Sequence, residues 1–169
     1  YGCLVGSEMC IRDSYRLLSK NYMNKTKNSL FQSKKNIHAH YDLGNDFYLE
    51  WLDDTLTYSS GFFKTGSETL SEAQKNKFES LIKGNEPRPG DHVLEIGSGW
   101  GSFAFYLISK FPDIKIDTLT ISKEQYEFVK TKIRENQLEN KLNVIYKDYR
   151  EHKGEYSRIY SIEMFEAVG

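Results

Sequence analysis

Cysteine is almost absent from this 169-residue sequence, and its two cysteines, Cys3 and Cys10, both lie within the first 14 residues. Residues 15–169 therefore offer neither a disulfide framework nor a cysteine-based metal site, which is typical of a protein of a reducing cytosol. The segment that holds both cysteines, YGCLVGSEMCIRDS, lacks the basic start and the sustained apolar stretch of a signal peptide. It is similar to translated adapter sequence, and we expect residues 1–14 to be non-native.

Long apolar runs are also missing, so the sequence offers no segment that could span a bilayer. Acidic residues are missing from residues 15–40, although the whole chain has a net charge of only -1. The basic residues of this arm are Arg16, Lys20, Lys25, Lys27, Lys34 and Lys35. A basic arm ahead of an acidic remainder favours an anionic partner, either a membrane surface or a nucleic acid, and the alternative is a solvated helix face.

Proline is rare, and two of the three prolines lie in NEPRPGD, residues 85–91, which is the clearest break in the chain. Beyond this break, apolar segments alternate with amphipathic ones. We expect strands at 92–98, 114–122, 142–148 and 157–165, and helices at 100–111 and 123–136. The alternation of strand and helix predicts an α/β fold with a parallel sheet, right-handed crossovers and helices on both faces.

The part before the break is predicted to be largely helical, with one or two short helices in 15–36 and an amphipathic helix in 38–52. We expect an extended loop at 55–63 and then a helix that begins at Ser67, with Ser71 as a second candidate cap. The apolar faces of the two longer helices are predicted to hold Phe47, Tyr48, Trp51 and Leu52 in the first, and Leu70, Ala73, Phe78, Leu81 and Ile82 in the second.

The stretch VLEIGSGWGS, residues 93–102, places three glycines after the first predicted strand. Ligands of parallel sheets bind outside the carboxyl ends of the strands. Gly97 permits a sharp turn, Gly99 lets the backbone approach a ligand, and Gly101 allows the next helix to pack closely against the strand. The spacing G-x-G-x-G differs from the dinucleotide fingerprint G-x-G-x-x-G, and Glu95 would repel a pyrophosphate while attracting a cation.

The pattern E-x-G-x-G-x-G resembles motif I of class I S-adenosylmethionine-dependent methyltransferases, whose cofactor carries a sulfonium and no phosphate. Five segments follow one another in the order and spacing of a narrower family: HYDLGNDFYLEWLDDTLTYSSGFF, VLEIGSGWGSFAFYL, LTISKEQ, DYR and SIEMFEAVG. Over residues 38–169 the sequence is similar to cyclopropane-fatty-acyl-phospholipid synthases and mycolic acid cyclopropane synthases.

The resemblance implies a Rossmann-like class I methyltransferase fold with two parts. Residues 15–84 would form an N-terminal helical or lid segment, and residues 85–169 the S-adenosylmethionine-binding domain. Because the predicted sheet stops after its fourth strand, we expect this domain to be truncated at Gly169 and to continue in the complete protein.

The resemblance also assigns cofactor contacts residue by residue. Tyr58 and Ser59 match a pair that contacts S-adenosylmethionine from the lid-like segment. The three loop glycines match the turn beside the methionine moiety, and Glu95 is expected nearby, where it balances the positive charge. The remaining matches are Thr120 and Gln125 for the ribose, Tyr149 beside the adenine, and Asp148 for its exocyclic amine.

The implied reaction transfers a methyl or methylene carbon from S-adenosylmethionine to the double bond of an unsaturated phospholipid acyl chain. Attack by the alkene leaves a carbocation, so the pocket is expected to be apolar and aromatic. The candidates for this lining are Phe62, Phe63 and Phe165.

In this family a bicarbonate ion is the proposed base, and Glu166 matches a carboxylate that helps to hold it. Ser60 stands where the family usually has cysteine, at a site that contacts the ion through its backbone. Ala167 replaces a histidine of the family pattern, so the product is open between a cyclopropane ring and a methyl branch. Glu163 is open between a wall of the site and a structural partner.

The resemblance places the protein in the cytoplasm, bound peripherally to anionic phospholipid at the inner membrane face, without a nucleic-acid partner and with oligomerisation left open. No metal is expected, and His38 and His40 are interpreted as hydrogen-bonding residues. Two other functions stay open from the sequence. One is a methyltransferase for an amine or another small acceptor, and the other is a non-catalytic binding fragment. A dinucleotide dehydrogenase fits least well.

Overall fold

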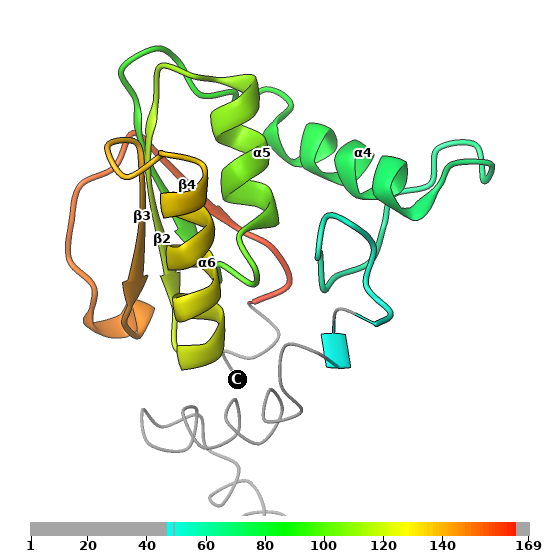
Figure 1. Ribbon diagram of the computed structural model, residues 1–169. Coiled ribbons are helices and arrows are strands. Elements are labelled where there is room, and N and C mark those ends of the chain that lie inside the picture. The colour runs from blue at the N-terminus through cyan, green and yellow to red at the C-terminus, as the bar shows by residue number, and fades with distance from the viewer. Residues whose placement is uncertain (1–46, 49, 165–169) are drawn as a thin grey trace, which may run out of the picture.

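The computed structural model describes residues 47, 48 and 50–164, and Figure 1 shows their arrangement. Within these residues, four parallel strands form one sheet in the order β3-β2-β1-β4. The strands are β1 (His92–Ile96), β2 (Lys115–Thr120), β3 (Leu142–Tyr146) and β4 (Arg158–Ser161). The helices are α4 (Leu70–Ile82), α5 (Ser102–Lys110), α6 (Lys123–Glu135) and the short 3-10 helix η1 (Tyr149–Glu151). The α/β fold with a parallel sheet is therefore confirmed.

The hydrophobic core lies between the sheet and the helices α5 and α6. The register pairs Val93 of β1 with Ile116 of β2, and Ile116 with Leu142 of β3, so the three side chains form a row on one face. All three are buried in one cluster with Leu107 of α5 and Val129 of α6. Both helices therefore cover the same face, as right-handed crossovers that step in one direction along a sheet require.

The opposite face of the sheet is covered by a different segment. Asp117 lies between the buried Ile116 and Thr118 on β2, so its side chain points away from α5 and α6. Asp117 Oδ2 accepts a hydrogen bond of 2.9 Å from Tyr156 Oη and lies 3.1 Å from His92 Nε2. The connection from β3 to β4 thus reaches this second face. The fold class predicts helices on both faces, and this connection contains the short helix η1.

The strands are shorter than the sequence pattern predicts. The strand expected at 92–98 ends at Ile96, because Gly97 adopts a φ of +93° and turns the chain out of the sheet. The segments expected at 114–122, 142–148 and 157–165 likewise shorten to β2, β3 and β4. Each predicted strand includes part of a turn, since residues such as Ile121 continue the apolar pattern beyond the last paired residue.

Helix α4 begins later than predicted, because Thr69 and not Ser67 is its N-cap. The Thr69 hydroxyl accepts a hydrogen bond from Glu72 N, and the Glu72 carboxylate accepts one of 2.8 Å from Thr69 N. These two bonds form a capping box, which satisfies two backbone donors at the start of the helix.

Replacing Thr69 with alanine is expected to lower the free energy of unfolding by about 1 kcal/mol, because the side-chain cap of α4 is lost. Ser67 offers a matched control, since its hydroxyl only pairs with Thr65 Oγ1, at 2.8 Å, in an exposed position. Ser67→Ala should change the unfolding free energy by less than about 0.5 kcal/mol. Chemical denaturation measures both variants, and equal losses would contradict Thr69 as the cap.

The buried face of α4 contains one polar residue that the apolar pattern misses. Ala73, Phe78 and Ile82 are buried as predicted, whereas the predicted Leu70 and Leu81 are exposed. Gln74 is buried on this face instead, with only 1% of its surface exposed. A buried glutamine needs hydrogen-bond partners, and those partners come from the loop that precedes the helix.

The described residues ahead of this loop are few, and the expectations for residues 15–46 lie outside them. Phe47 and Tyr48 are helical, and Trp51 N and Leu52 N donate to Tyr48 O at 3.4 and 3.0 Å. Tyr48 is buried, with its ring centroid 4.7 Å from that of Trp100. The predicted boundaries stay predictions: residue 14 as the end of the non-native segment, and residue 84 as the end of the helical or lid segment. Within the described ranges, every helix is too short or too polar to cross a bilayer.

Candidate active site

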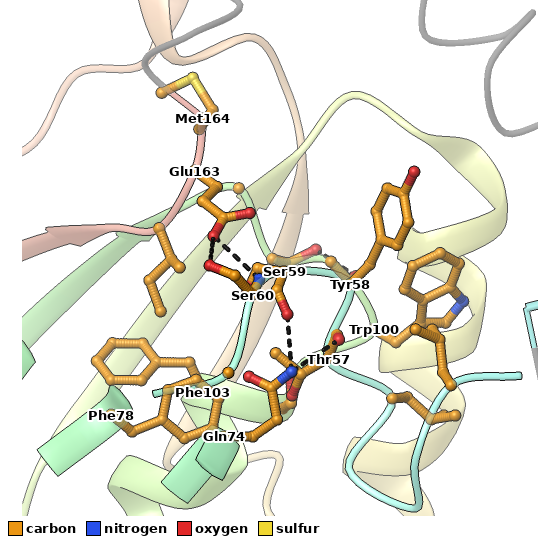
Figure 2. Close-up of a pocket in the computed structure, with 18 of the residues that line it drawn as sticks. Thr57, Tyr58, Ser59, Ser60, Gln74, Phe78, Trp100, Phe103, Glu163 and Met164 are labelled. Carbon is orange, nitrogen blue, oxygen red and sulfur yellow. Dashed lines mark hydrogen bonds between the residues drawn. The ribbon is translucent and has the colours of Figure 1, made fainter. Parts of the chain in front are cut away.

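A cavity of about 790 Å³ lies at the carboxyl ends of the strands. Gly97 after β1, Gln125 at the start of α6 and Ile162 after β4 line it on the sheet side. The segment ahead of α4 closes it on the other side, together with Leu70, Gln74 and Phe78 of that helix. Figure 2 shows this second wall, where the loop of Thr57–Ser60 lies between Gln74 and Glu163. Parallel sheets bind their ligands at this position.

Two glycines of the loop after β1 line the cavity, and both have positive φ. The φ angles are +93° at Gly97 and +50° at Gly99. A Cβ atom built on Gly97 would stand 3.4 Å from Met164 Cβ, whereas one built on Gly99 would meet nothing within 4 Å. The space beside Gly99 is therefore open, as expected where a ligand approaches a bare backbone.

Gly101 differs from its predicted role. It is absent from the described cavity wall and forms the N-cap of α5 with a φ of +90°. A Cβ atom at this position would lie 2.9 Å from Phe105 Cε2 and 3.3 Å from Val129 Cγ2. Gly101 therefore allows close packing within α5 and against α6, and not against the strand as the spacing suggests. Its contact with a cofactor stays a prediction.

Glu95 is a buried acid in the cavity wall, near the end of β1 and only 2% exposed. Thr118 Oγ1 on the neighbouring strand donates a hydrogen bond of 2.6 Å to Glu95 Oε2. Burial raises the pKa of Glu95 from its ordinary value of 4.5 to about 8, and the Thr118 bond opposes the shift. A cation beside this carboxyl would stabilise its charged form and bring the pKa back down.

Thr120 and Gln125, predicted as a pair, are joined in the structure. Thr120 Oγ1 donates a hydrogen bond of 2.9 Å to Gln125 Oε1 and accepts one of 3.1 Å from Ser122 N. Ser122 is the N-cap of α6 and accepts a hydrogen bond from Gln125 N at 3.3 Å. Both predicted residues are buried, and Gln125 lines the cavity. The cap thus fixes an amide side chain at the tip of β2.

Tyr58, Ser59 and Ser60 line the cavity from the loop that precedes α4. Ser59 O accepts a hydrogen bond of 2.7 Å from Gln74 Nε2. The Tyr58 ring lies edge-on to that of Trp100, at 6.4 Å between centroids. The predicted lid-like segment is therefore held against both α4 and the glycine loop.

Ser60 contacts Glu163, which follows β4 and also lines the cavity. Ser60 N and Ser60 Oγ donate to Glu163 Oε1 at 3.1 and 2.8 Å. Glu163 is therefore both a wall of the site and a structural partner, which joins the two interpretations that the sequence leaves open. Glu166, the other predicted catalytic residue, lies outside the described residues, and its role stays a prediction.

Asp148 and Tyr149 are absent from the described cavity wall. Asp148 is buried and caps η1, and its carboxylate accepts hydrogen bonds from Arg150 Nε and Nη2 at 2.9 and 2.7 Å. Tyr149 is the first residue of η1. Their predicted contacts with an adenine stay predictions.

The cavity is aromatic, as predicted, but its rings come from other residues. Phe62 and Phe63 are each 47% exposed and do not belong to the described wall, and Phe165 lies outside the described residues. The aromatic residues of the wall are Trp51, Tyr58, Phe78, Trp100 and Phe103. The signal for Trp100 in the sequence is its position between Gly99 and Gly101, within the loop that lines the cavity.

The acidic side chains in the described cavity wall are Glu95, which its raised pKa of about 8 keeps protonated at neutral pH, and Glu163. Lysine, arginine and histidine are absent from this wall within the described ranges. Carboxylates repel phosphate groups and attract cations, so the wall suits a cationic ligand better than a dinucleotide. The described residues contain no group of three side chains that could hold a metal ion.

A parallel sheet with α5 and α6 on one face, and a glycine-lined acidic cavity at its carboxyl ends, is the fold of class I methyltransferases. The comparison with known sequences narrows this class. Residues 28–169 match the family described as mycolic acid cyclopropane synthetase, and the chain belongs to this family.

Individual relatives agree with this assignment. The chain is 35% identical over 130 residues to the cyclopropane-fatty-acyl-phospholipid synthase of Escherichia coli K12, covering 77% of this chain and 32% of that protein. The crystal structure of mycolic acid cyclopropane synthase CmaA1 complexed with SAH and CTAB matches with a TM-score of 0.74 and 32% identity, over 79% of this chain and 46% of that one.

A third relative is named for a different activity, methyl transfer to nitrogen. The crystal structure of coclaurine N-methyltransferase bound to N-methylheliamine and SAH matches with a TM-score of 0.68 and 27% identity, over 74% of this chain and 36% of that one. The chain therefore spans between about a third and a half of the length of these three relatives.

Proposed function

We propose that this chain supplies the S-adenosylmethionine site of a methyltransferase that adds a one-carbon unit to the double bond of an unsaturated phospholipid acyl chain. The observation that carries the proposal is the cavity at the strand ends, where Gly99 leaves open space and the described wall offers carboxyl groups but no lysine, arginine or histidine. The name of the E. coli relative and the SAH in the CmaA1 structure support it.

The residues of the cavity fit this cofactor. The bare backbone at Gly97 and Gly99 would take the methionine moiety, with Glu95 close by to balance its positive charge. Gln125, fixed by Thr120, offers an amide to a ribose hydroxyl. Tyr58 and Ser59 would contact the cofactor from the loop ahead of α4.

The aromatic wall fits the chemistry. When bound, S-adenosylmethionine supplies an electrophilic methyl group on a sulfonium. Positive charge develops on an acyl chain whose double bond takes up that carbon, and the faces of Trp100, Phe78 and Phe103 would stabilise it without adding a nucleophile. Closing of the site by these rings would also exclude water from the cation.

Ring closure also needs a base that removes a proton from the transferred carbon. We propose that Glu166 holds a bicarbonate ion, as the family resemblance implies. The backbone N–H of Ser60, which the resemblance assigns to the same ion, donates to Glu163 in this chain. The ion would have to share or displace that contact, so Ser60 could serve it only together with Glu163.

The experiment that tests the proposal measures acyl-chain mass. Incubating the protein with S-adenosylmethionine and unsaturated phospholipid vesicles is expected to add a one-carbon unit to the acyl chains, detected by lipid mass spectrometry. Saturated phospholipid is the matched control and should stay unchanged. Unchanged unsaturated lipid, with cofactor binding confirmed by titration, would contradict the lipid acceptor and leave the cofactor site intact.

A second candidate function keeps the cofactor and changes the acceptor to an amine. The Glu163 carboxylate favours it, because it lines the cavity and could pair with an ammonium group. The likeness to coclaurine N-methyltransferase points in the same direction. A screen of amines with the same protein separates the two functions, since an amine methyltransferase would leave the lipid untouched.

We further propose that the protein acts in the cytoplasm at the inner face of the membrane. The basic arm of residues 15–40 carries six positive charges and no acid, so it would bind anionic headgroups. Replacing anionic lipid by neutral lipid in the vesicle assay is expected to slow the reaction, and raised salt should do the same.

A further inference from the structure

The loop of residues 57–62 is attached firmly to helix α4. Gln74 Nε2 donates to Ser59 O at 2.7 Å and to Thr57 O at 3.4 Å. Phe62 N donates to Ala73 O at 2.9 Å. The loop therefore runs along α4.

On its other side the loop is held by Glu163, which belongs to the end of the sheet. Its carboxylate accepts both the backbone N–H and the hydroxyl of Ser60 (Figure 2). This contact joins segments that are 103 residues apart in sequence, and it lies in an exposed position. Water can replace an exposed hydrogen bond at small cost, so the contact can break and re-form.

A cation on helix α4 also binds the loop. Lys77 Nζ of α4 donates to Ser59 Oγ. Partial burial lowers the pKa of Lys77, while the negative charges of Glu163 and Asp53 oppose that shift. Consecutive serines are thus held by a cation from α4 and an anion from the end of β4.

Three residues that border the loop have unfavourable features. Leu56 and Glu163 adopt φ angles of +52° and +51°, a region that residues with a side chain rarely occupy. Both residues line the cavity. Gln74 Oε1 is buried and finds no hydrogen-bond partner within the described residues. Strain of this kind persists only where surrounding contacts impose it.

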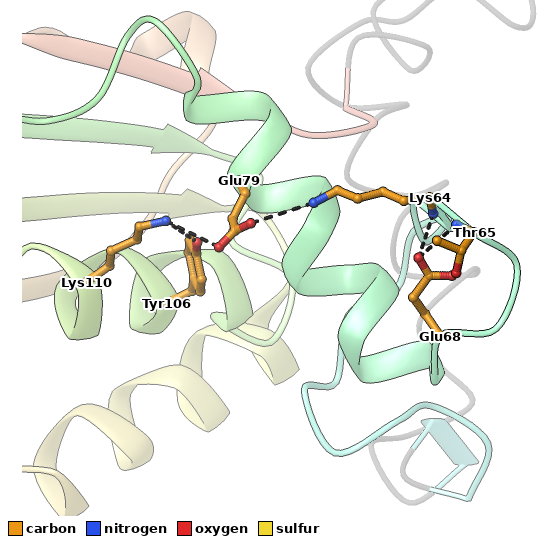
Figure 3. Close-up of polar contacts among 6 residues, drawn as sticks. All are labelled: Lys64, Thr65, Glu68, Glu79, Tyr106 and Lys110. Carbon is orange, nitrogen blue, oxygen red and sulfur yellow. Dashed lines mark hydrogen bonds and ion pairs between the residues drawn. The ribbon is translucent and has the colours of Figure 1, made fainter.

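The base of the loop is fixed, so its movement would be local. Glu68 Oε1 accepts hydrogen bonds of 2.9 Å from Lys64 N and Thr65 N. The Glu79 carboxylate lies between Lys64 Nζ at 3.8 Å and Lys110 Nζ of α5 at 3.5 Å, and Figure 3 shows these contacts. Helix α4 and the end of the loop are therefore tied to the sheet domain independently of Glu163.

From these contacts we propose that Glu163 is a positioning residue that latches the loop of residues 57–62 over the cavity and so controls how long a ligand stays there. The latch works through the acceptor oxygen of Glu163, because both donors of Ser60 meet the same atom. The ligand named in the test, S-adenosylhomocysteine, rests on the proposed function. The movement of the loop does not.

The latch is tested first without ligand, by hydrogen–deuterium exchange of the full chain. Glu163→Ala is expected to speed exchange of the amides of residues 57–62 by about fivefold, the loss of one or two exposed hydrogen bonds. Glu163→Gln keeps the acceptor oxygen and should stay close to wild type. Glu139→Ala, in an exposed loop after α6, is the matched surface control.

Ligand release is the second readout. Dissociation of S-adenosylhomocysteine is expected to be about fivefold faster in Glu163→Ala and unchanged in Glu163→Gln and Glu139→Ala. Glu163→Gly relieves the positive φ, so it should release the ligand faster while its melting temperature holds or rises. That combination separates an open latch from general loss of structure.

The outcomes distinguish the two proposals. If wild type fails to bind S-adenosylhomocysteine but Glu163→Ala still frees the loop in hydrogen exchange, the latch stands and the proposed cofactor is wrong. If wild type binds the ligand and Glu163→Ala changes neither exchange nor release, the latch is wrong. Equal effects of Glu163→Ala and Glu163→Gln would also overturn it, because the charge and not the acceptor would then matter.

Discussion

Raising the pH from about 5 to about 9 is expected to lower the free energy of unfolding through Glu95 alone by an amount on the order of 4 kcal/mol. Burial holds the pKa of Glu95 at about 8 in the folded protein, above its ordinary value of 4.5. Below the lower value the carboxyl is protonated in both states. Between the two values only the folded state keeps the proton, so its stabilising effect declines as the pH rises and is lost above about 8.

Glu95→Gln isolates this effect because glutamine is neutral at every pH and has nearly the same shape. The variant should lose most of the decline in stability between these two pKa values and be more stable than wild type at high pH. Glu139→Gln, with an exposed side chain, is the matched control and should keep the wild-type dependence. Denaturation curves across the pH range measure the slope, and an unchanged slope in Glu95→Gln would contradict a buried neutral carboxyl.

The same group should make ligand binding depend on pH with the opposite sign. A cationic ligand beside Glu95 favours the ionised carboxyl, so binding releases a proton wherever the free protein still holds it. Affinity for S-adenosylmethionine should therefore rise with pH and level off above about 8. Calorimetry in buffers of different ionisation enthalpy reports the released proton, and Glu95→Gln should abolish it.

Replacing Gly101 with alanine is expected to lower the free energy of unfolding by about 2 to 4 kcal/mol, the second large effect. The new methyl group would lie 2.9 Å from the Phe105 ring and 3.3 Å from Val129 Cγ2, at a φ of +90° that alanine strongly disfavours. Phe105 can move by a few tenths of an ångström, but the backbone strain stays. A thermal melt of the purified variant measures the loss.

Gly99→Ala is the matched comparison and should show the reverse pattern. Its φ of +50° lies in the left-handed region that alanine can adopt at a cost of about 1 kcal/mol. A Cβ atom there meets nothing within 4 Å, so the fold has room for it, but the methyl group occupies the open space of the cavity. Binding of S-adenosylhomocysteine should weaken by about tenfold or more in this variant.

Together the two variants separate packing from binding within one short loop. Gly101→Ala should melt at a clearly lower temperature, whereas Gly99→Ala should melt close to wild type and bind the ligand poorly. Normal binding by Gly99→Ala would contradict the location of the cofactor site. A wild-type melting temperature for Gly101→Ala would show that Phe105 and the backbone adapt more easily than the geometry indicates.

The sheet could be predicted from sequence because its signals are local. Each signal can be recognised within a window of about ten residues: the alternating apolar segments, the glycines after β1 and the break at residues 85–91. The strand ends are harder to predict. The chain leaves the sheet at Gly97 because of its positive φ, and Ile121 is apolar although it lies beyond the end of β2. The start of α4 required a choice between hydroxyl residues, and the capping box with Glu72 favours Thr69.

The sequence predicts the residues of the candidate site that belong to local motifs. It does not predict contacts between residues that are far apart in the sequence. Tyr58, Glu95, Gly99 and Gln125 reach the cavity as the family resemblance implies. The pairing of Ser60 with Glu163 depends on the path of the chain between them, which no local pattern encodes. Gln74 had one usable signal, a polar side chain in the middle of an otherwise apolar helix face.

The acidic residue Glu95 in the cavity wall has a consequence for turnover. Methyl transfer converts a sulfonium into a neutral thioether, so the occupant of the cavity loses one positive charge in the reaction. Glu95 would then face a ligand that no longer compensates its negative charge. Under the proposed function the site would hold its product less tightly than its substrate, and accumulated S-adenosylhomocysteine should inhibit weakly. Loss of the sulfonium charge would therefore favour release of the product from the site.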